Sequence, residues 1–267
     1  MKKTHWSDLP QEVQDAVRLI VGGVTDIEMI SEGLNSELTL AAETESGRLF
    51  FKGARLDDSG KSLQLRREIS INPYVTHLSP KIRVQVEEAG WLLVGFDHVE
   101  GRRADYSPKS PDIPLVLELL DALSETPCPG IPLPYSESRR SNHARVDDLR
   151  RFAGNSLMHT DLNPGNVWIA RDRAYLLDWA RPTRGASWSD ASALALCLIT
   201  CGHIPRDAEA IVSALPVWKD LGPGDLDAAV QYMSAVRSDL VRNPIDDHWT
   251  NSAVEAARRW WDYRWSR

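Results

Sequence analysis

The sequence predicts an α+β chain with two lobes, an N-terminal antiparallel sheet with one helix and a mostly helical C-terminal lobe. Two observations support this prediction. Short apolar runs separated by turn residues follow one another early in the chain, which is typical of an antiparallel sheet. Farther on, apolar residues recur mainly at helical spacing. We expect the first lobe to span residues 1–98 and the second to span residues 99–267.

The first lobe is expected to combine strands with an opening helix and one later helix. These elements should lie at residues 10–21 (helix), 27–30, 37–42 and 48–52 (strands) and 62–71 (helix). The later helix is placed there because Ser62 suits an N-cap position and Pro73 stands just past its end.

The second lobe is expected to be helical around a few short strands. Leucines recur near the 3.6-residue period within residues 113–123, which predicts a helix there. A loop is expected at residues 126–141, which are rich in Pro and Ser. Further helices should lie at 187–201, 206–214, 225–242 and 251–264, and short strands at 156–158, 167–170 and 174–177.

One polar loop contains His159, Asp161 and Asn166 in the pattern H-x-D-x-x-x-x-N, and Asp178 follows an apolar run after it. Phosphoryl transfer needs a carboxylate that receives and aims the acceptor hydroxyl, and hard oxygen ligands that hold Mg²⁺ on the phosphates. Asp161 suits the first need, and Asn166 with Asp178 suits the second. A chance turn is the alternative, but the flanking strands favour the functional interpretation. The pattern therefore predicts a phosphotransferase.

Two upstream residues fit the same chemistry. Lys52 ends an expected strand, and Glu68 lies within the helix that follows. A lysine in a largely apolar cleft needs a fixed carboxylate to keep it charged and aimed at phosphate. Each residue alone could be an ordinary surface group. Together with the downstream loop, they predict a phosphate-anchoring pair.

The segment from Ser31 to Ser36 lies between two expected strands and should fold over the nucleotide phosphates. It has one glycine and no G-x-G-x-x-G, so Ser36 and its backbone N–H are the candidate phosphate contact; a plain hairpin loop is the alternative. Gly60-Lys61-Ser62 looks like the end of a Walker A motif, but Gly53 is too far upstream to complete it. Residues 57–61 are therefore expected to form a solvated loop.

The order of these elements and the phrase His-Thr-Asp-Leu-Asn-Pro-Gly-Asn at residues 159–166 resemble the aminoglycoside phosphotransferase family. That family includes choline-kinase-like and other small-molecule kinases with a protein-kinase-like fold. The resemblance runs over about residues 6–198. It implies ATP and Mg²⁺ as cofactors, Asp161 as the catalytic base within a motif that includes His159, and Asn166 and Asp178 as the metal ligands. The implied acceptor is a hydroxyl of a small molecule, such as an aminoglycoside or another antibiotic.

The resemblance also assigns a hinge and a supporting pair. Residues 91–101 look like the family's last N-lobe strand and hinge. Trp188 and Asp190 resemble the pair that opens the next helix and supports the catalytic loop. Backbone groups expected to bond the adenine edge belong to Gly95, Phe96, Asp97 and His98.

Two rival functions are weighed against this one. A non-catalytic pseudokinase scaffold would be marked by loss of Asp161, Asn166, Asp178 or Lys52, and none is lost. A protein kinase is disfavoured by the single-glycine loop and the lack of an activation segment. Thr160 also replaces the Arg that answers activation-loop phosphorylation in protein kinases.

Composition suggests which partners and which compartment to expect. The chain has 31 basic and 38 acidic residues, and the net charge of −7 argues against a nucleic-acid partner and suits a cationic acceptor. We expect no signal peptide or membrane span, and three cysteines are typical of a reducing cytosol, so a cytoplasmic location is expected. Acidic groups such as Asp246 and Asp247 should border the acceptor site.

Overall fold

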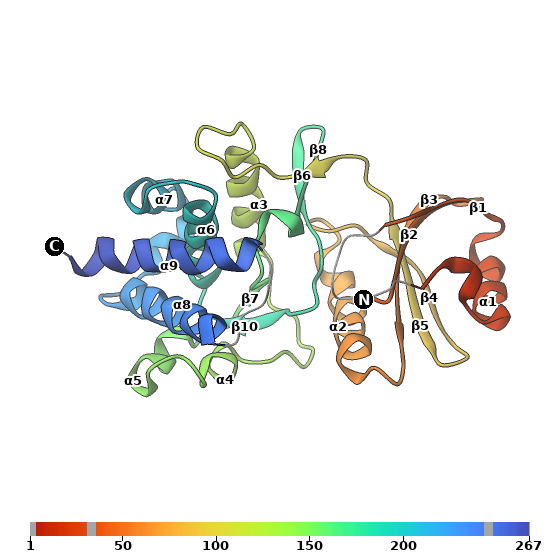
Figure 1. Ribbon diagram of the computed structural model, residues 1–267, viewed down its shortest axis with the longest axis horizontal. Helices are drawn as coiled ribbons and strands as arrows, with labels where there is room; N and C mark the ends of the chain where they lie inside the picture. The colour runs from red at the N-terminus through yellow and green to blue at the C-terminus, as the bar shows by residue number, and fades with distance from the viewer. Residues whose placement is uncertain (1–3, 31–35, 243–247, 267) are drawn as a thin grey trace. The chain divides into compact units, whose positions relative to one another are not determined.

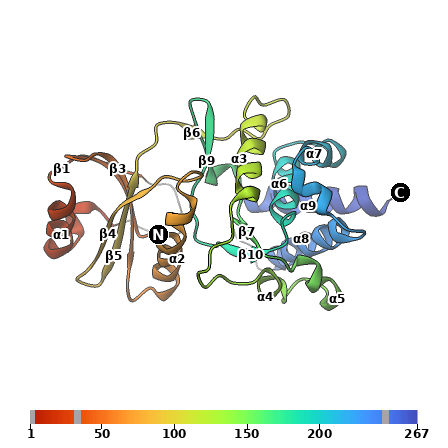
Figure 2. The same cartoon turned by 180° about the vertical axis from the view of Figure 1, so that it is seen from behind.

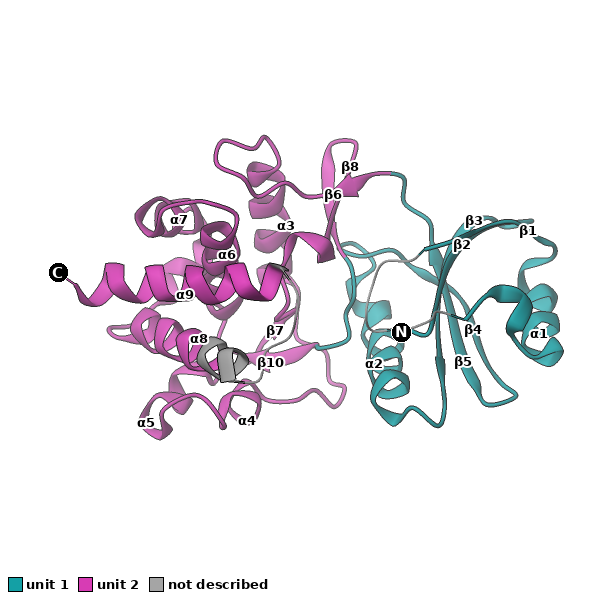
Figure 3. Cartoon of the chain, viewed as in Figure 1, with its two compact units in different colours: residues 1–100, 177–181 teal, residues 101–176, 182–267 magenta. Residues whose placement is uncertain are grey.

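The computed structural model describes residues 4–30, 36–242 and 248–266. Two compact units make up the chain (Figure 3). Unit 1 comprises Met1–Glu100 and Leu177–Arg181, and unit 2 comprises Gly101–Leu176 and Pro182–Arg267. The short segment Leu177–Arg181 thus joins unit 1 although the sequence analysis grouped it with the second lobe. Asp246 and Asp247, expected to border the acceptor site, lie outside the described residues, as does the expected phosphate loop apart from Ser36.

Unit 1 contains a five-stranded antiparallel sheet in the order β1-β2-β3-β5-β4 (Figure 1). The strands are β1 (Val24–Met29), β2 (Leu38–Thr44), β3 (Gly47–Arg55), β4 (Ile82–Glu88) and β5 (Trp91–Asp97). β4 was not among the expected strands. Its buried Val84 and Val86 alternate with exposed residues, which is the pattern of a strand with one face on the core.

The two longer helices of unit 1, α1 (Gln11–Val21) and α2 (Ser59–Val75), pack on opposite faces of this sheet. Leu93 belongs to the apolar cluster that contains α1, whereas Leu92 and Val94 belong to the cluster that contains α2. Because successive strand residues point to opposite faces, this alternation places one helix on each side. The expected antiparallel sheet with its helix is therefore confirmed, and the opening helix covers the second face.

α2 is longer than expected at both ends. Its N-cap is Asp58, whose carboxylate accepts the backbone N–H of Lys61 at 3.1 Å, so Ser62 is not the cap. The expected solvated loop at 57–61 is accordingly wrong from Ser59 onward. Pro73 lies inside the last turn. A proline inside a helix lacks one backbone N–H donor, but the helix nevertheless continues to Val75.

Unit 2 is mostly helical, as expected. Its longer helices are α3 (Ile113–Glu125), α6 (Ser189–Thr200), α7 (Pro205–Val212), α8 (Asp225–Arg242) and α9 (His248–Trp265). α8 and α9 lie side by side and both contact α6, as the two opposite views show (Figures 1 and 2). Trp260 of α9 is fully buried in this packing. Within the described residues, no helix is long and apolar enough to cross a membrane.

Short helical elements complete both units. They are η1 (Trp6–Asp8) in unit 1 and, in unit 2, α4 (Ser136–Arg140), α5 (Val146–Leu149), η2 (Arg150–Phe152), η3 (Pro164–Asn166) and η4 (Pro216–Asp220). α4 corrects the expectation of a continuous loop at 126–141. Its first residue, Ser136, is fully buried and packs on Gly185, where a β-carbon would lie 2.6 Å from the Ser136 side chain. That tertiary contact is not visible in the local composition.

Two small sheets frame the polar loop of unit 2. β7 (Ser156–Met158) pairs with β10 (Thr183–Gly185), and β8 (Val167–Ala170) pairs with β6 (Arg102–Arg103) and with β9 (Arg173–Leu176). β7 leads into residues 159–166 and β8 leads out of them, as expected from the sequence.

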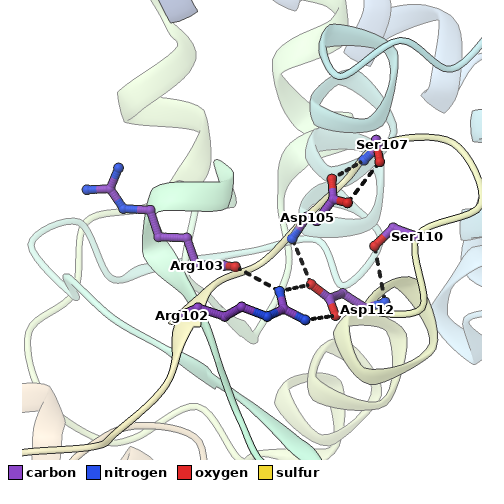
Figure 4. Close-up of polar contacts among 6 residues, drawn as sticks. All are labelled: Arg102, Arg103, Asp105, Ser107, Ser110 and Asp112. Carbon is purple, nitrogen blue, oxygen red and sulfur yellow. Dashed lines mark hydrogen bonds and ion pairs between the residues drawn. The ribbon is translucent and has the colours of Figure 1, made fainter.

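An ion-pair cluster fixes the start of unit 2 (Figure 4). The carboxylate of Asp112, only 3% exposed, accepts two hydrogen bonds from the Arg102 guanidinium and one from the backbone N–H of Asp105 at 2.8 Å. Arg102 belongs to β6, which pairs with β8. The cluster therefore ties β6, the strand that enters unit 2, to the start of α3. Because β6 pairs with β8, it is also joined to the strand that follows the polar loop.

Candidate active site

Lys52, Glu68 and Asp178 meet within unit 1. The ammonium of Lys52 donates to both carboxylate oxygens of Glu68, at 3.0 and 2.9 Å, and to Oδ1 of Asp178 at 3.2 Å. β3 supplies the lysine, α2 the glutamate and the segment Leu177–Arg181 the second aspartate. Their side chains are 14%, 7% and 22% exposed, so Asp178 has the most access to solvent. The expected Lys52–Glu68 contact is present.

One buried cation shared by two carboxylates shapes the charges of this cluster. Burial opposes the charge of Lys52, yet Glu68 and Asp178 together raise the lysine pKa above its ordinary value, so the ammonium is fully charged. Burial raises the pKa of Glu68 to about 7, with Lys52 opposing this shift and the charge of Asp178 adding to it. The cluster has surplus negative charge when both carboxylates are ionised. Such a cluster attracts a cation.

In unit 2, Asp161 lies in a loop stabilised by short-range hydrogen bonds. The side-chain amide of Asn163 donates to Oδ1 of Asp161 at 2.7 Å, while its oxygen accepts the backbone N–H of Gly165 at 2.8 Å. The side-chain amide of Asn166 donates to the backbone carbonyl of Asp161 at 3.1 Å. These hydrogen bonds orient the carboxylate of Asp161. Because Asn166 uses its amide nitrogen, its side-chain oxygen can serve as a hard ligand for a metal ion.

His159 and Asp190 support this loop from inside unit 2. Asp190, in the first turn of α6, accepts the backbone N–H groups of His159 at 2.7 Å and Thr160 at 3.0 Å. Thr160 has φ of 72°, a strained conformation for a β-branched residue. The buried ring of His159 accepts the backbone N–H of Asp161 through Nδ1 at 3.3 Å. The geometry of His159 is thus that of a residue that orients the loop.

The expected hinge residues lie at the end of β5. Gly95 is required by packing, because a β-carbon there would lie 2.8 Å from the ring of Phe51. The backbone N–H groups of Asp97 and His98 donate to Lys81 and Arg48 carbonyls at 2.9 and 3.3 Å. Both N–H groups are therefore used inside unit 1, and Phe96 is buried.

Ser36 lies directly before β2 and is partly buried. The next residue, Glu37, donates its backbone N–H to the carbonyl of Gly53 at 3.0 Å, one residue beyond Lys52. This register places the Ser36 end of the expected phosphate loop beside the end of β3 that carries the lysine.

Asn163 is a residue of the site that the sequence analysis missed. It belongs to an Asn-Pro-Gly sequence, which is typical of an ordinary turn, so the composition gave no sign that its side chain also bonds to the carboxylate of Asp161. The signal that could have identified it is its position two residues after Asp161, from which a short amide side chain reaches back to the carboxylate within a turn.

Comparisons with known proteins identify no sequence relative but several structural ones. No protein-family model matches the sequence. No curated protein sequence matches it either.

Among solved structures, choline kinase LicA from Streptococcus pneumoniae is 13% identical, with a TM-score of 0.61 over 94% of this chain and 98% of that chain. Macrolide 2'-phosphotransferase MphH from Brachybacterium faecium is 13% identical, with a TM-score of 0.59 over 92% and 97%.

A thermostable mutant of aminoglycoside phosphotransferase APH(4)-Ia, in a ternary complex with AMP-PNP and hygromycin B, is also similar. It is 13% identical, and the TM-score is 0.64 over 92% of this chain and 98% of that chain. At such low identity the likeness concerns the fold. The chain therefore has the bilobal, protein-kinase-like fold of these small-molecule phosphotransferase structures.

Proposed function

We propose that this protein is an ATP-dependent phosphotransferase that moves the γ-phosphoryl group to a hydroxyl of a small molecule. The observation that carries the proposal is the ammonium of Lys52, bonded at once to Glu68 and to Asp178, which lies 126 residues away in sequence. A buried lysine aimed by one glutamate beside a solvent-accessible aspartate is the arrangement that phosphate anchoring requires. The fold shared with known phosphotransferase structures supports the same conclusion.

In this proposal, residues 1–98 form the nucleotide-binding lobe and residues 99–267 the catalytic and acceptor-binding lobe. Lys52 contacts the nucleotide phosphates, and Glu68 keeps it aimed. Ser36 contacts phosphate at the end of the loop. The hinge segment from Gly95 to His98 supplies the backbone groups that bond the adenine edge. The N–H groups of Asp97 and His98 already donate inside unit 1, so the other backbone groups of this segment are the first to test.

Asn166 and Asp178 are the proposed Mg²⁺ ligands. Their donor chemistry fits that ion, since an amide oxygen and a carboxylate are hard ligands. The Asn166 side chain is oriented by the bond from its amide nitrogen to Asp161. Bound Mg²⁺ would neutralise phosphate charge during transfer.

Asp161 is the proposed catalytic base. It accepts a hydrogen bond from the acceptor hydroxyl and takes its proton as the oxygen–phosphorus bond forms and the bond to ADP breaks. Asn163 holds one oxygen of the carboxylate and leaves the other for the acceptor. His159 fixes the loop through the backbone of Asp161.

We propose hydroxylated antibiotics, aminoglycosides first, as the acceptor class to test, with antibiotic resistance in the cytoplasm as the biological role. The structural likeness to an aminoglycoside and a macrolide phosphotransferase supports this choice.

The test is a panel of acceptors incubated with the purified protein, ATP and Mg²⁺. The panel holds aminoglycosides, other hydroxylated antibiotics, amino alcohols and a generic protein, with Asp161→Asn as the matched inactive control. We expect ADP release and a phosphorylated product with a small molecule. Phosphorylation of the protein substrate alone would favour a protein kinase, and nucleotide binding without any transfer would favour a pseudokinase scaffold.

A further inference from the structure

One face of α2 carries a row of four residues, three of which have polar side chains. Lys61, Leu65, Glu68 and Asn72 follow one another at spacings of four, three and four. Residues at these spacings lie above one another along a helix. Leu65 joins the apolar cluster with β5, and the three polar residues each bond to another part of unit 1. Glu68, which holds Lys52, is therefore the middle of three polar attachments.

The C-terminal attachment is Asn72, which is 5% exposed. Its amide nitrogen donates to the carbonyl of Pro80 at 2.8 Å, and its amide oxygen accepts the backbone N–H of Ile82 at 2.9 Å. Both hydrogen bonds are made to the chain that enters β4. This end of α2 is thus fixed to the edge of the sheet.

The N-terminal attachment is an ion pair between Lys61 and Glu37. The ammonium lies 3.2 Å from Oε1 of Glu37, and the two side chains are only 17% and 15% exposed. Lys61 also pairs with the capping residue Asp58 at 2.9 Å. Glu37 is the residue after Ser36, and its backbone N–H is bonded to Gly53, next to Lys52.

These attachments matter because the contact between Lys52 and Glu68 depends on where α2 lies. Glu68 is buried, and its two carboxylate oxygens lie 3.0 and 2.9 Å from the ammonium of Lys52. A buried carboxylate is costly unless a charged or hydrogen-bonding partner stays within bonding distance of it. A small slide or rotation of α2 would lengthen the Lys52–Glu68 contact, so whatever fixes the helix also sets the anchor for phosphate.

We propose that Lys61 is a positioning residue for nucleotide binding, and that its ion pair with Glu37 couples the strand after Ser36 to the helix that carries Glu68. Lys61 acts through the Glu68–Lys52 pair and does not touch the nucleotide. The inference rests on the proposed function, since its effect is read in nucleotide affinity. It also gives a role to the Gly-Lys-Ser phrase that mimics a Walker A motif.

The experiment is a double-substitution cycle read by calorimetric titration with Mg²⁺-AMP-PNP, which needs no acceptor. The variants are Lys61→Met, Glu37→Gln, the pair combined, and the conservative Lys61→Arg. The matched control is Arg66→Met, which breaks another α2 ion pair, Arg66–Glu87 at 2.9 Å, whose side chains are 45% and 43% exposed. Circular dichroism melts verify that each variant is folded at the titration temperature.

We expect Lys61→Met and Glu37→Gln each to weaken binding by about 5- to 10-fold, and the combined variant to add less than about 2-fold more. Lys61→Arg and Arg66→Met should stay within about 2-fold of wild type. Loss in Lys61→Met with no loss in Glu37→Gln would overturn the inference in favour of direct phosphate contact by Lys61. Equal affinity in all variants would overturn it as well. If the wild-type protein does not bind Mg²⁺-AMP-PNP, the proposed function fails first and the inference falls with it.

Discussion

The proposed phosphate anchor of unit 1 and the proposed catalytic loop of unit 2 are held by different kinds of interaction. In unit 1, two carboxylates from distant parts of the sequence meet around one ammonium. In unit 2, Asp161 is held by neighbours within a few residues and by backbone bonds to Asp190. The anchor depends on charge balance, whereas the loop depends on shape. Substitutions in the two regions should therefore impair nucleotide binding, turnover and stability to different extents.

The largest effect is expected for Asp178→Ala. It removes a proposed metal ligand and one of the two carboxylates that balance Lys52. Both Mg²⁺-nucleotide affinity and turnover should fall, with kcat/KM lower by more than about 10⁴-fold, because a metal contributes several kcal/mol of charge stabilisation. Calorimetry and steady-state kinetics measure the two losses.

Asp178 has φ of 60°, a conformation that asparagine tolerates better than alanine. Asp178→Asn is therefore the control for backbone strain. Normal nucleotide affinity in both variants would contradict the metal-ligand assignment.

Asp161→Asn should separate chemistry from binding. The amide keeps the shape of the side chain but cannot take a proton, so Mg²⁺-nucleotide binding should survive. General bases contribute about 10²–10⁴-fold, and kcat should fall within that range. Turnover near the wild-type value on the true acceptor would show that the loop has been assigned wrongly.

Asp190→Ala tests whether shape governs the loop. The change removes the carboxylate that accepts the backbone N–H groups of His159 and Thr160, and it should lower the free energy of unfolding by about 2–4 kcal/mol. kcat should fall more than nucleotide affinity. The matched control is Ser192→Ala on the same helix, which loses a bond to the helix backbone and should cost less than about 1 kcal/mol. Equal losses in the two variants, measured by urea unfolding, would remove Asp190 from its supporting role.

The smallest effect is expected for Asp112→Asn at the start of unit 2. The Arg102 guanidinium holds the pKa of Asp112 below its ordinary value of 3.8. Since the folded pKa is depressed, the ionised carboxylate stabilises the fold above about pH 4, and this contribution is lost as pH falls through the folded pKa. We expect a loss of about 1–3 kcal/mol at pH 7, as for hydrogen bonds to charged groups. Urea unfolding from pH 7 to pH 3 should show the difference from wild type shrinking only below about pH 4; a constant difference would contradict it.

How much could be predicted from the sequence differs between the same two regions. The strands at 156–158 and 167–170 lie where expected, because alternation and turn residues act locally. The contact between Lys52 and Glu68 followed from the order of a strand and a helix. Metal binding by Asn166 and the roles of the other site residues remain predictions.

The N-cap of α2 and the ion pair of Lys61 were missed because local sequence patterns do not determine them. Asp58 and Ser62 are both good caps, and only the packed helix shows that Asp58 is used. The pair between Lys61 and Glu37 joins residues that are distant in sequence and unremarkable as surface charges. Both follow from tertiary packing.

The membership of Leu177–Arg181 in unit 1 bears on how the chain folds during its synthesis. Residues 1–100 emerge first, but unit 1 is complete only when residue 181 has followed. At about 5–20 residues per second, the ribosome takes roughly 4–16 s to add the residues between these two points. During that interval, Glu68 has been synthesised but Asp178 has not, so Lys52 has only one of its two carboxylate partners. The first unit to be synthesised is therefore finished by a segment delivered from the middle of the second, and a fragment ending at residue 100 would lack Asp178 altogether.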